Sequence, residues 1–177
     1  MKRDLSEFKV KNSRSFKLQH VCWWLVQNLI FKTFWFPSKA RVITLRLFGA
    51  KIGQQVLIRR GVRVHFPEKL TIGDNSWIGE DVWFINHEGI DIGSNVCVSQ
   101  SVVICSSSHD FRTSSLDYKH SDIQICDGAW ICLRATILAG GKVGVNSIVS
   151  AGEVFAGDLK DEHIFMNGIE KPIGYLD

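Results

Sequence analysis

The sequence contains few prolines and no long uninterrupted run of hydrophobic residues. Only three of its 177 residues are proline and 45% are hydrophobic, a composition that favours a compact, soluble fold. The longest apolar stretch covers residues 21–36 and contains Gln27, Asn28 and Lys32. A helix that spans a bilayer needs roughly 20 apolar residues, so we predict no transmembrane span.

The sequence also lacks a secretory signal peptide at its start and closely spaced cysteine pairs. The amino terminus is charged, and the first apolar run begins only at Val21. The five cysteines are spread along the chain, which argues against a disulfide framework or a Cys-x-x-Cys metal site. We therefore expect buried, reduced thiols and a cytoplasmic protein.

Positive and negative charges are separated along the chain. Residues 1–50 carry ten Lys or Arg against two Asp or Glu, a net charge of +8, whereas the remainder carries eleven against sixteen, a net charge of −5. No nucleic-acid-binding motif accompanies the basic region, so we expect no nucleic-acid partner. Two interpretations remain for residues 21–48. They form helices that cover the rest of the fold, or they contact an anionic membrane surface from the cytoplasmic side as a peripheral segment.

A six-residue repeat extends from Ile52 to Lys160. The first residue of every repeat is Ile, Val or Phe, the second is often Gly or another small residue, and Asn recurs at the fourth. A period of six matches neither the 3.6-residue period of an α-helix nor the open alternation of a long strand. The fifteen opening residues are Ile52, Ile58, Val64, Ile72, Ile78, Phe84, Ile92, Val98, Ile104, Ile125, Ile131, Ile137, Val143, Val149 and Phe155.

This period predicts an all-β solenoid in which three short strands and their corners form one coil. The opening residues point inward, and coils stack at the inter-strand spacing of roughly 4.8 Å. Corner residues must tolerate a left-handed backbone, which suits Asn75, Asn95 and Asn146 at the fourth position. The repeats group into about five coils, at residues 52–69, 72–89, 92–109, 125–142 and 143–160.

The repeat divides the chain into three parts. We predict a basic, aromatic helical segment over residues 1–50, the hexapeptide-repeat solenoid over 51–160 and a C-terminal extension over 161–177. The repeat is interrupted by an excursion of fifteen residues, 110–124. A long excursion from a rigid scaffold is typical of a functional loop.

The hexads themselves resemble a known family. The run Ile72-Gly73-Asp74-Asn75-Ser76-Trp77 and the hexad that follows it are similar to the hexapeptide-repeat acyltransferases, whose solenoid is a left-handed parallel β-helix, an exception to the usual crossover hand. More narrowly, residues 47–53, the triplet Ser108-His109-Asp110 and the pair Trp23-Trp24 resemble the colanic-acid-type sugar O-acetyltransferases of exopolysaccharide pathways. The resemblance implies a homotrimer that binds acetyl-coenzyme A between neighbouring solenoids.

His109, directly before the excursion, is the candidate catalytic residue. In the resembled family the histidine at this place is the general base. An imidazole with a pKa of about 6.5 is mostly neutral at pH 7 and can accept the proton of an attacking hydroxyl. Because a thioester is already activated, no enzyme nucleophile is required, and the sequence shows no Ser-His-Asp arrangement. The expected reaction is direct attack of a sugar hydroxyl on acetyl-coenzyme A.

The preceding coil carries the candidate acceptor-binding residues. Asn86 and His87 occupy a corner where the resembled family places polar groups that bind the acceptor, although corner geometry alone also explains such residues. Glu88 stands at a position that is usually small or apolar, so we expect it to orient His87 or the acceptor. His65, His87 and His109 recur at a spacing of 22 residues but fall at different hexad positions, so we predict no metal site.

The resemblance also assigns residues to coenzyme A. Trp130 matches a tryptophan beside the pantetheine arm, and Ala151 with Gly152 matches backbone groups that bond the pantetheine amides. Lys171 falls where the family keeps a basic residue near the nucleotide phosphates. The sequence departs from the family pattern around that position, so Arg134 is a further candidate there.

The sequence therefore predicts an acetyl-coenzyme A-dependent O-acetyltransferase that acts on a sugar or glycan, free or linked to a nucleotide or a lipid, in surface-glycan assembly. Acetylation of an amino-sugar nitrogen is an alternative, because an amine also loses a proton. A third alternative is a β-helix that acts as a scaffold or binds zinc. The identity of the acceptor is not encoded in any motif of the chain.

Overall fold

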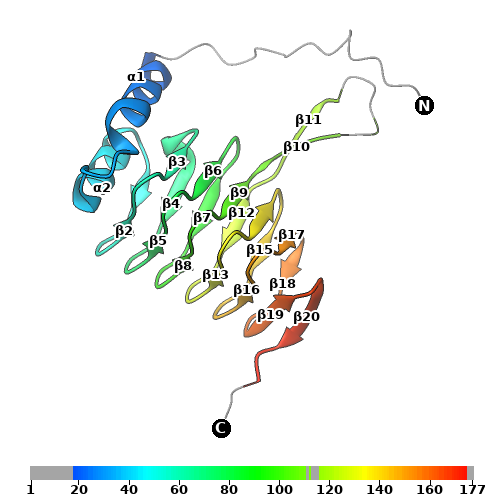
Figure 1. Ribbon diagram of the computed structural model, residues 1–177. Coiled ribbons are helices and arrows are strands. Elements are labelled where there is room, and N and C mark those ends of the chain that lie inside the picture. Colours follow the sequence, from blue (N-terminus) through cyan, green and yellow to red (C-terminus); the bar gives the residue numbers. More distant parts are fainter. Residues whose placement is uncertain (1–17, 111, 113–115, 175–177) are drawn as a thin grey trace.

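Short parallel strands form the three faces of a triangular solenoid, and two helices with a π-helical turn cover its N-terminal end (Figure 1). This computed structural model describes residues 18–110, 112 and 116–174. The first face is a parallel sheet of six strands. They are β1 (Lys51–Ile52), β4 (Leu70–Ile72), β7 (Ile90–Ile92), β12 (Ile123–Ile125), β15 (Lys142–Val143) and β18 (Asp158–Leu159).

The second face continues the solenoid and ends in a hairpin, in which the last strand pairs antiparallel with the one before it. Its strands are β2 (Leu57–Ile58), β5 (Trp77–Ile78), β8 (Cys97–Val98), β13 (Trp130–Ile131), β16 (Ile148–Val149), β19 (His163–Met166) and β20 (Ile169–Pro172).

The third face has five parallel strands, and a 3-10 turn, η3 (Pro67–Lys69), follows its first strand. The strands are β3 (Arg63–Val64), β6 (Trp83–Ile85), β9 (Val103–Cys105), β14 (Thr136–Leu138) and β17 (Val154–Phe155).

The opening residues of the repeat form the core. All fifteen are buried, with exposed fractions between 0% and 8%, and they stack in register between neighbouring coils, as Ile72 does on Ile92. The corners adopt the left-handed backbone that the fourth position predicts, with φ of 56° at Asn75, 58° at Asn95 and 54° at Asn146. The repeat therefore specifies both the inward face and the corners, as predicted.

The solenoid has about six turns, so the prediction of about five coils was too low. The strands β18 and β19 belong to a further turn, which begins at Asp158 and continues past Lys160. In that turn the buried Leu159 follows Phe155 by four residues instead of six, which breaks the period at the point where the repeat was judged to end. Strand β11 (Tyr118–His120) of the excursion pairs antiparallel with β10 (Ser107–His109) directly before it, and this hairpin projects from the third coil (Figure 1).

The N-terminal helical elements cover the open end of the first coil. These are α1 (Leu18–Val26), the π-helical turn η2 (Gln27–Phe31) and α2 (Ser38–Leu47). Trp23, Phe31 and Leu45 are buried and belong to the same core cluster as the openers of the repeat.

Polar side chains of these helices satisfy the exposed strand edges of the first coil. At β3, the Trp23 indole donates to the carbonyl of Val64 at 2.8 Å, and the amide of Val64 donates to Gln27 Oε1 at 2.7 Å. At β1, the Arg46 guanidinium donates to the carbonyl of Ile52 at 2.8 Å. Because an open strand edge invites pairing with another chain, the helices close this end of the solenoid.

Candidate active site

His109 lies at the end of β10, at the base of the projecting hairpin, and its side chain is exposed. Its Nδ1 is 2.7 Å from the carbonyl oxygen of Leu116 on the opposite side of the hairpin. A carbonyl only accepts hydrogen bonds, so this contact places the proton of the neutral imidazole on Nδ1 and the basic lone pair on Nε2. The neighbouring Asp110 instead accepts a hydrogen bond from the amide of Arg112.

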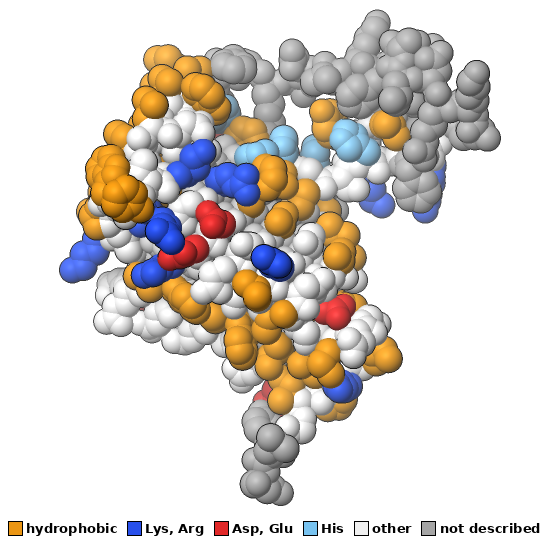
Figure 2. Space-filling view, in the orientation of Figure 1, with side chains coloured by type: hydrophobic (Ala, Val, Ile, Leu, Met, Phe, Trp, Pro, Cys, Tyr) orange, Lys and Arg blue, Asp and Glu red, His pale blue; other side chains and the backbone are white. Residues whose placement is uncertain are grey.

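A row of neighbouring rings connects His109 to the solenoid. The ring of Tyr118 lies 4.7 Å from that of His109 and 5.2 Å from that of His120, and the His120 ring stacks on His87 at 5.5 Å. Hairpin register explains the row, because Tyr118 pairs with His109, and residues two apart on a strand share a face. The histidines gather along one side of the surface in Figure 2.

The row continues from the hairpin to the first coil. The ring of His87 lies 5.2 Å from Phe66 and 5.5 Å from His65. The different hexad positions of His65 and His87 do not keep their side chains apart, because both lie near the corner that ends the third face. Sequence analysis did not assign a role to Tyr118 or His120. Both lie in the excursion, and their contacts depend on the antiparallel pairing of β10 with β11.

Asn86 is the structural support of this corner. Its side chain is fully buried, its Oδ1 accepts hydrogen bonds from the amides of His65 and Phe66 at 3.1 and 3.0 Å, and its amide nitrogen donates to the carbonyl of Phe66. Because its polar atoms bond the backbone of the neighbouring coil, Asn86 fixes the corner on which His65 and His87 are mounted.

Glu88 is tied to the same corner by an ion pair. Its carboxylate lies 3.0 Å from Lys69 Nζ, which also donates to the carbonyl of His87. Ser106, which is buried, accepts a hydrogen bond from the Glu88 amide at 2.9 Å. The carboxylate therefore neutralises the lysine that bonds the backbone of His87.

His65 lies in a less polar setting than an exposed histidine. Burial lowers its pKa, and the nearby charge of Arg63 lowers it further. The guanidinium of Arg63 lies 4.1 Å from the ring centroid of Trp83 in a cation–π contact, and the rings of Trp83 and His65 are 5.9 Å apart. Burial and the charge of Arg63 therefore both favour the neutral form of the His65 imidazole.

The residues assigned to coenzyme A lie elsewhere on the chain. Trp130 on β13 is 47% exposed, and its indole donates to Ser99 Oγ at 2.9 Å. Arg134 occupies the next corner with φ of 58°, and Gly152, with φ of 75°, follows Ala151 at the same corner one coil later. This corner joins the second and third faces, whereas the His109 hairpin leaves from the opposite end of the third face (Figure 1).

Lys171 is exposed on β20, where it pairs with Ile164 of β19. It therefore belongs to the terminal hairpin of the second face, beyond the coil that carries Gly152. One chain thus does not bring the residues assigned to coenzyme A together with His109.

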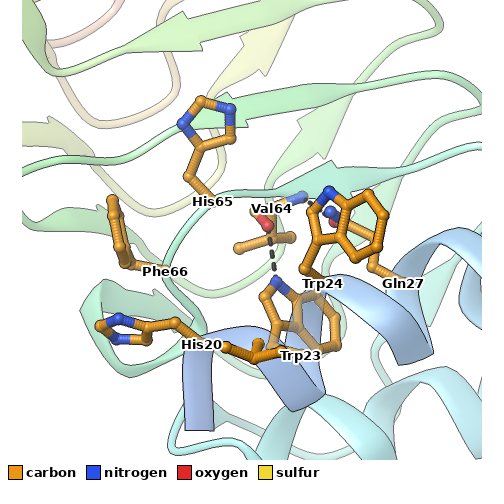
Figure 3. A pocket seen from close by; sticks show the side chains of 8 residues that line it. His20, Trp23, Trp24, Gln27, Val64, His65 and Phe66 are labelled. Carbon is orange, nitrogen blue, oxygen red and sulfur yellow. Dashed lines mark hydrogen bonds between the residues drawn. The ribbon is translucent and has the colours of Figure 1, made fainter. Parts of the chain in front are cut away.

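An apolar pocket of about 390 Å³ lies between α1 and the first coil, near the end of the ring row. Figure 3 shows Trp23, Trp24 and His20 on the helix side and His65 and Phe66 on the coil side. Sequence analysis did not identify this pocket, because it depends on how the helices seat on the coil.

Two further properties concern the described part of the chain. Within residues 18–110, 112 and 116–174, no group of three or more His, Cys, Asp or Glu side chains is arranged to hold a metal ion. Over those same ranges, none of the helices combines the length and the apolar character needed to cross a membrane.

Comparison with known proteins identifies relatives along most of the chain. No protein-family model matches it. It is 35% identical over 156 residues to WcaF of Escherichia coli K12, a protein provisionally named as a colanic acid biosynthesis acetyltransferase, and the match covers 84% of each chain.

Two solved structures have the same fold. A maltose O-acetyltransferase from Clostridium difficile superposes with a TM-score of 0.77 at 22% identity, and a hexapeptide-repeat acetyltransferase from Vibrio cholerae, complexed with acetyl-coenzyme A, with a TM-score of 0.76 at 21% identity. Each match covers 90% of this chain and 86% of the other. These likenesses confirm the left-handed parallel β-helix that the hexads predicted.

Proposed function

The chain belongs to the hexapeptide-repeat acetyltransferases of the colanic acid type, and we propose that it transfers an acetyl group from acetyl-coenzyme A to a sugar hydroxyl. The acceptor is a sugar or glycan of surface or exopolysaccharide assembly. The solved Vibrio cholerae structure is complexed with acetyl-coenzyme A, which supports the same donor here, and we place the reaction in the cytoplasm.

His109 is the proposed general base, and its contact with Leu116 is the observation that carries the proposal. With Nδ1 bound to the Leu116 carbonyl at 2.7 Å, Nε2 is the nitrogen that accepts the hydroxyl proton. The hydroxyl oxygen then attacks the thioester carbonyl, the C–S bond breaks, and the proton passes from Nε2 to the departing thiolate. The thioester supplies the activation, so no covalent enzyme intermediate is required.

The ring row is the proposed acceptor surface. Tyr118 is 46% exposed and has the rings of His109 and His120 as neighbours, so its exposed edge and hydroxyl are the parts that can contact a sugar. His87 extends this surface and can donate or accept hydrogen bonds. Asn86 and Glu88 act indirectly, Asn86 by fixing the backbone of the corner and Glu88 through Lys69.

The donor surface is proposed to lie on a neighbouring subunit of a homotrimer. Arg134, Ala151 and Gly152 are exposed at the corner that joins the second and third faces, and Trp130 is exposed on β13 just before it. A Cβ added to Gly152 would meet no atom within 4 Å. A long, flexible molecule can therefore approach the Gly152 backbone. With Lys171 on the terminal hairpin, these residues would meet His109 only across a subunit interface.

The outward side chains of the second face support self-association. Neighbouring coils pair these side chains into one column that is apolar throughout, whereas the corresponding column of the first face is polar. The two columns are Leu57, Trp77, Cys97, Trp130, Ile148 and Ile164 on the second face, and Lys51, Thr71, Asp91, Gln124, Lys142 and Asp158 on the first.

The test is acceptor-dependent release of free thiol from acetyl-coenzyme A, measured over nucleotide sugars, free sugars, amino sugars and lipid-linked glycans. We expect His109→Ala to reduce turnover by roughly 10²–10⁴, the usual range for loss of a general base, while folding is retained. His163→Ala is the matched control, because Nδ1 of His163 also lies 2.7 Å from a carbonyl, that of Asp161, but on the terminal hairpin.

Near-normal turnover of His109→Ala would contradict the assigned base. Faster thiol release with amino sugars than with hydroxyl acceptors would replace O-acetylation by N-acetylation. A protein that binds no coenzyme A, or that purifies with stoichiometric zinc, would contradict the transferase itself.

A further inference from the structure

Large exposed hydrophobic side chains are concentrated on the N-terminal helical elements. Among the described residues, nine of seventeen such side chains fall within residues 18–47, and the other eight are spread over the rest. Figure 2 shows this hydrophobic surface over α1 and α2. We call these nine side chains the helical face: Leu18, Trp24, Leu25, Leu29, Ile30, Phe34, Trp35, Ile43 and Leu47.

Packing against the solenoid does not account for the helical face. In α1 only Trp23 is buried, and Val26 is partly buried against the same core. Leu18 and Leu25 lie seven residues apart on α1, which places them on the same side of that helix, and Leu29 follows in the turn η2. Leu29 is 68% exposed and Phe34 is 79% exposed. These apolar side chains therefore face away from the core.

The charge around the helical face is mainly positive. The sequence contains no Asp or Glu from residue 8 to residue 67. Arg59 and Arg60 share the carboxylate of Glu80, at 3.1 and 3.3 Å, so that group of three remains positive. The exposed basic residues of this region in the described chain are Lys39, Arg46, Lys51, Arg59 and Arg60.

We propose that the helical face docks into the interfacial region of an anionic lipid bilayer. Exposed Trp, Phe and Leu side chains enter the boundary between head groups and acyl chains, and Lys and Arg beside them bind anionic head groups. The helices lie on the surface, because none is long enough to span a membrane. A second copy fits less well, because its own basic residues would meet a surface of like charge.

Docking would also place the apolar pocket at the lipid boundary. Trp24 is 61% exposed on the helical face and lines the pocket as well. From the pocket, His65 and His87 lead to the hairpin in ring-to-ring steps of 5.5 Å. A lipid-linked acceptor could then hold its lipid end at the pocket and its sugar near Tyr118. This consequence rests on the proposed function, whereas docking itself does not.

Vesicle co-sedimentation of the full-length protein tests the proposal. We expect binding to vesicles that contain phosphatidylglycerol and little binding to phosphatidylcholine alone. The double variant Leu25→Gln/Leu29→Gln should bind roughly 10-fold more weakly or worse, because it removes apolar insertion. Val154→Gln/Ile169→Gln, at side chains that are 60% and 64% exposed on the solenoid, is the matched control and should bind as the unaltered protein does.

A second pair of variants tests the charge. Lys39→Gln/Arg60→Gln should weaken binding by roughly 10- to 30-fold, since each basic residue near the surface contributes about 1 kcal/mol. Lys142→Gln/Lys160→Gln, exposed on the solenoid, should have little effect. Thiol release with a soluble acceptor should be unchanged in every variant, which separates docking from the chemistry.

Three results would overturn the proposal. The first is that the protein binds neither type of vesicle. Binding that survives the two leucine changes would mean that charge alone attracts the chain. A particle mass that grows with concentration without lipid, and that falls in the leucine variant, would make the helical face a contact between copies.

Discussion

Apolar residues are distributed differently in the β-helix and in the helical segment at its N-terminal end. In the β-helix, every opener of the repeat is buried, and the exposed apolar side chains are few for its length. In residues 18–47, Trp23, Phe31, Val42 and Leu45 are buried, whereas nine large apolar side chains are exposed. The buried residues of the two regions form one continuous core. The regions therefore differ in their outer surfaces, which are far more apolar on the helices.

The two regions differ because a coil packs on other coils, whereas each helix packs on a single coil. A coil packs on copies of itself, so one six-residue pattern fixes the buried position on every turn. A helix at the end of the stack has a coil on one side only. Such a helix has one side against the coil and one side exposed. Some of its polar residues lie on the coil side, where they bond backbone groups. Arg41, for example, is 4% exposed and donates to the carbonyls of Phe31, Thr33 and Ile58.

Truncating one apolar side chain in each region gives the widest contrast. Phe84→Ala should lower the free energy of unfolding by about 3–5 kcal/mol, because the side chain is fully buried between coils. Leu29→Ala should change it by less than about 0.5 kcal/mol, because its side chain is largely exposed. Urea unfolding followed by circular dichroism measures both. A large loss at Leu29 would show that the helical face is covered within the protein itself.

Removing the charge of Arg41 tests how the two regions are joined. Arg41→Met keeps the length of the side chain but leaves three carbonyls without their donor, so we expect a loss of roughly 2–3 kcal/mol. Lys39→Met, on the same helix but exposed, is the matched control. Hydrogen exchange should show faster opening of α2 and β2 in the arginine variant alone. Equal stability of the two variants would mean that apolar packing is sufficient to hold the helices.

The second residue of the hexad offers a more local test within the β-helix. A Cβ added to Gly79 would lie 2.7 Å from backbone atoms of Ser99 and Gln100 on the next coil. Gly79→Ala should therefore cost about 1–3 kcal/mol through overpacking. Gly174→Ala, where an added Cβ meets nothing within 4 Å, should be neutral in the same urea titration. If both were neutral, the coils would be free to separate slightly at this corner.

The regular part of the fold could be predicted from the sequence because the same buried position recurs on every coil. Ile58, Ile78 and Val98 occupy equivalent positions on successive coils, so each supports the assignment of the others. The sixth turn was missed because only the spacing between Phe155 and Leu159 marks it. A single irregular interval carries no repeated signal and cannot be separated from an ordinary loop.

The candidate site was predictable only in part. His109 stands beside a break in the repeat, which the sequence shows directly. Its contact with Leu116 and its ring contact with Tyr118 depend on how the two arms of the hairpin pair. Asn86, predicted to bind the acceptor, is fully buried and bonds backbone atoms of the neighbouring coil. A corner amide looks the same in the sequence whether it faces a ligand or the next coil.

The smallest expected effect is a pH dependence at the junction of the two regions. Burial, and then the charge of Arg63, lower the pKa of His65 in the folded protein, whereas the unfolded chain keeps the usual value of about 6.5. As pH falls below about 6.5, the unfolded state binds a proton that the folded state takes up only at lower pH, so stability decreases over that range. We expect His65→Gln to flatten the fall in urea midpoint between about pH 7.5 and 5.5. The same fall in both proteins would mean that other groups account for it, and that His65 contributes to the pocket only through its shape.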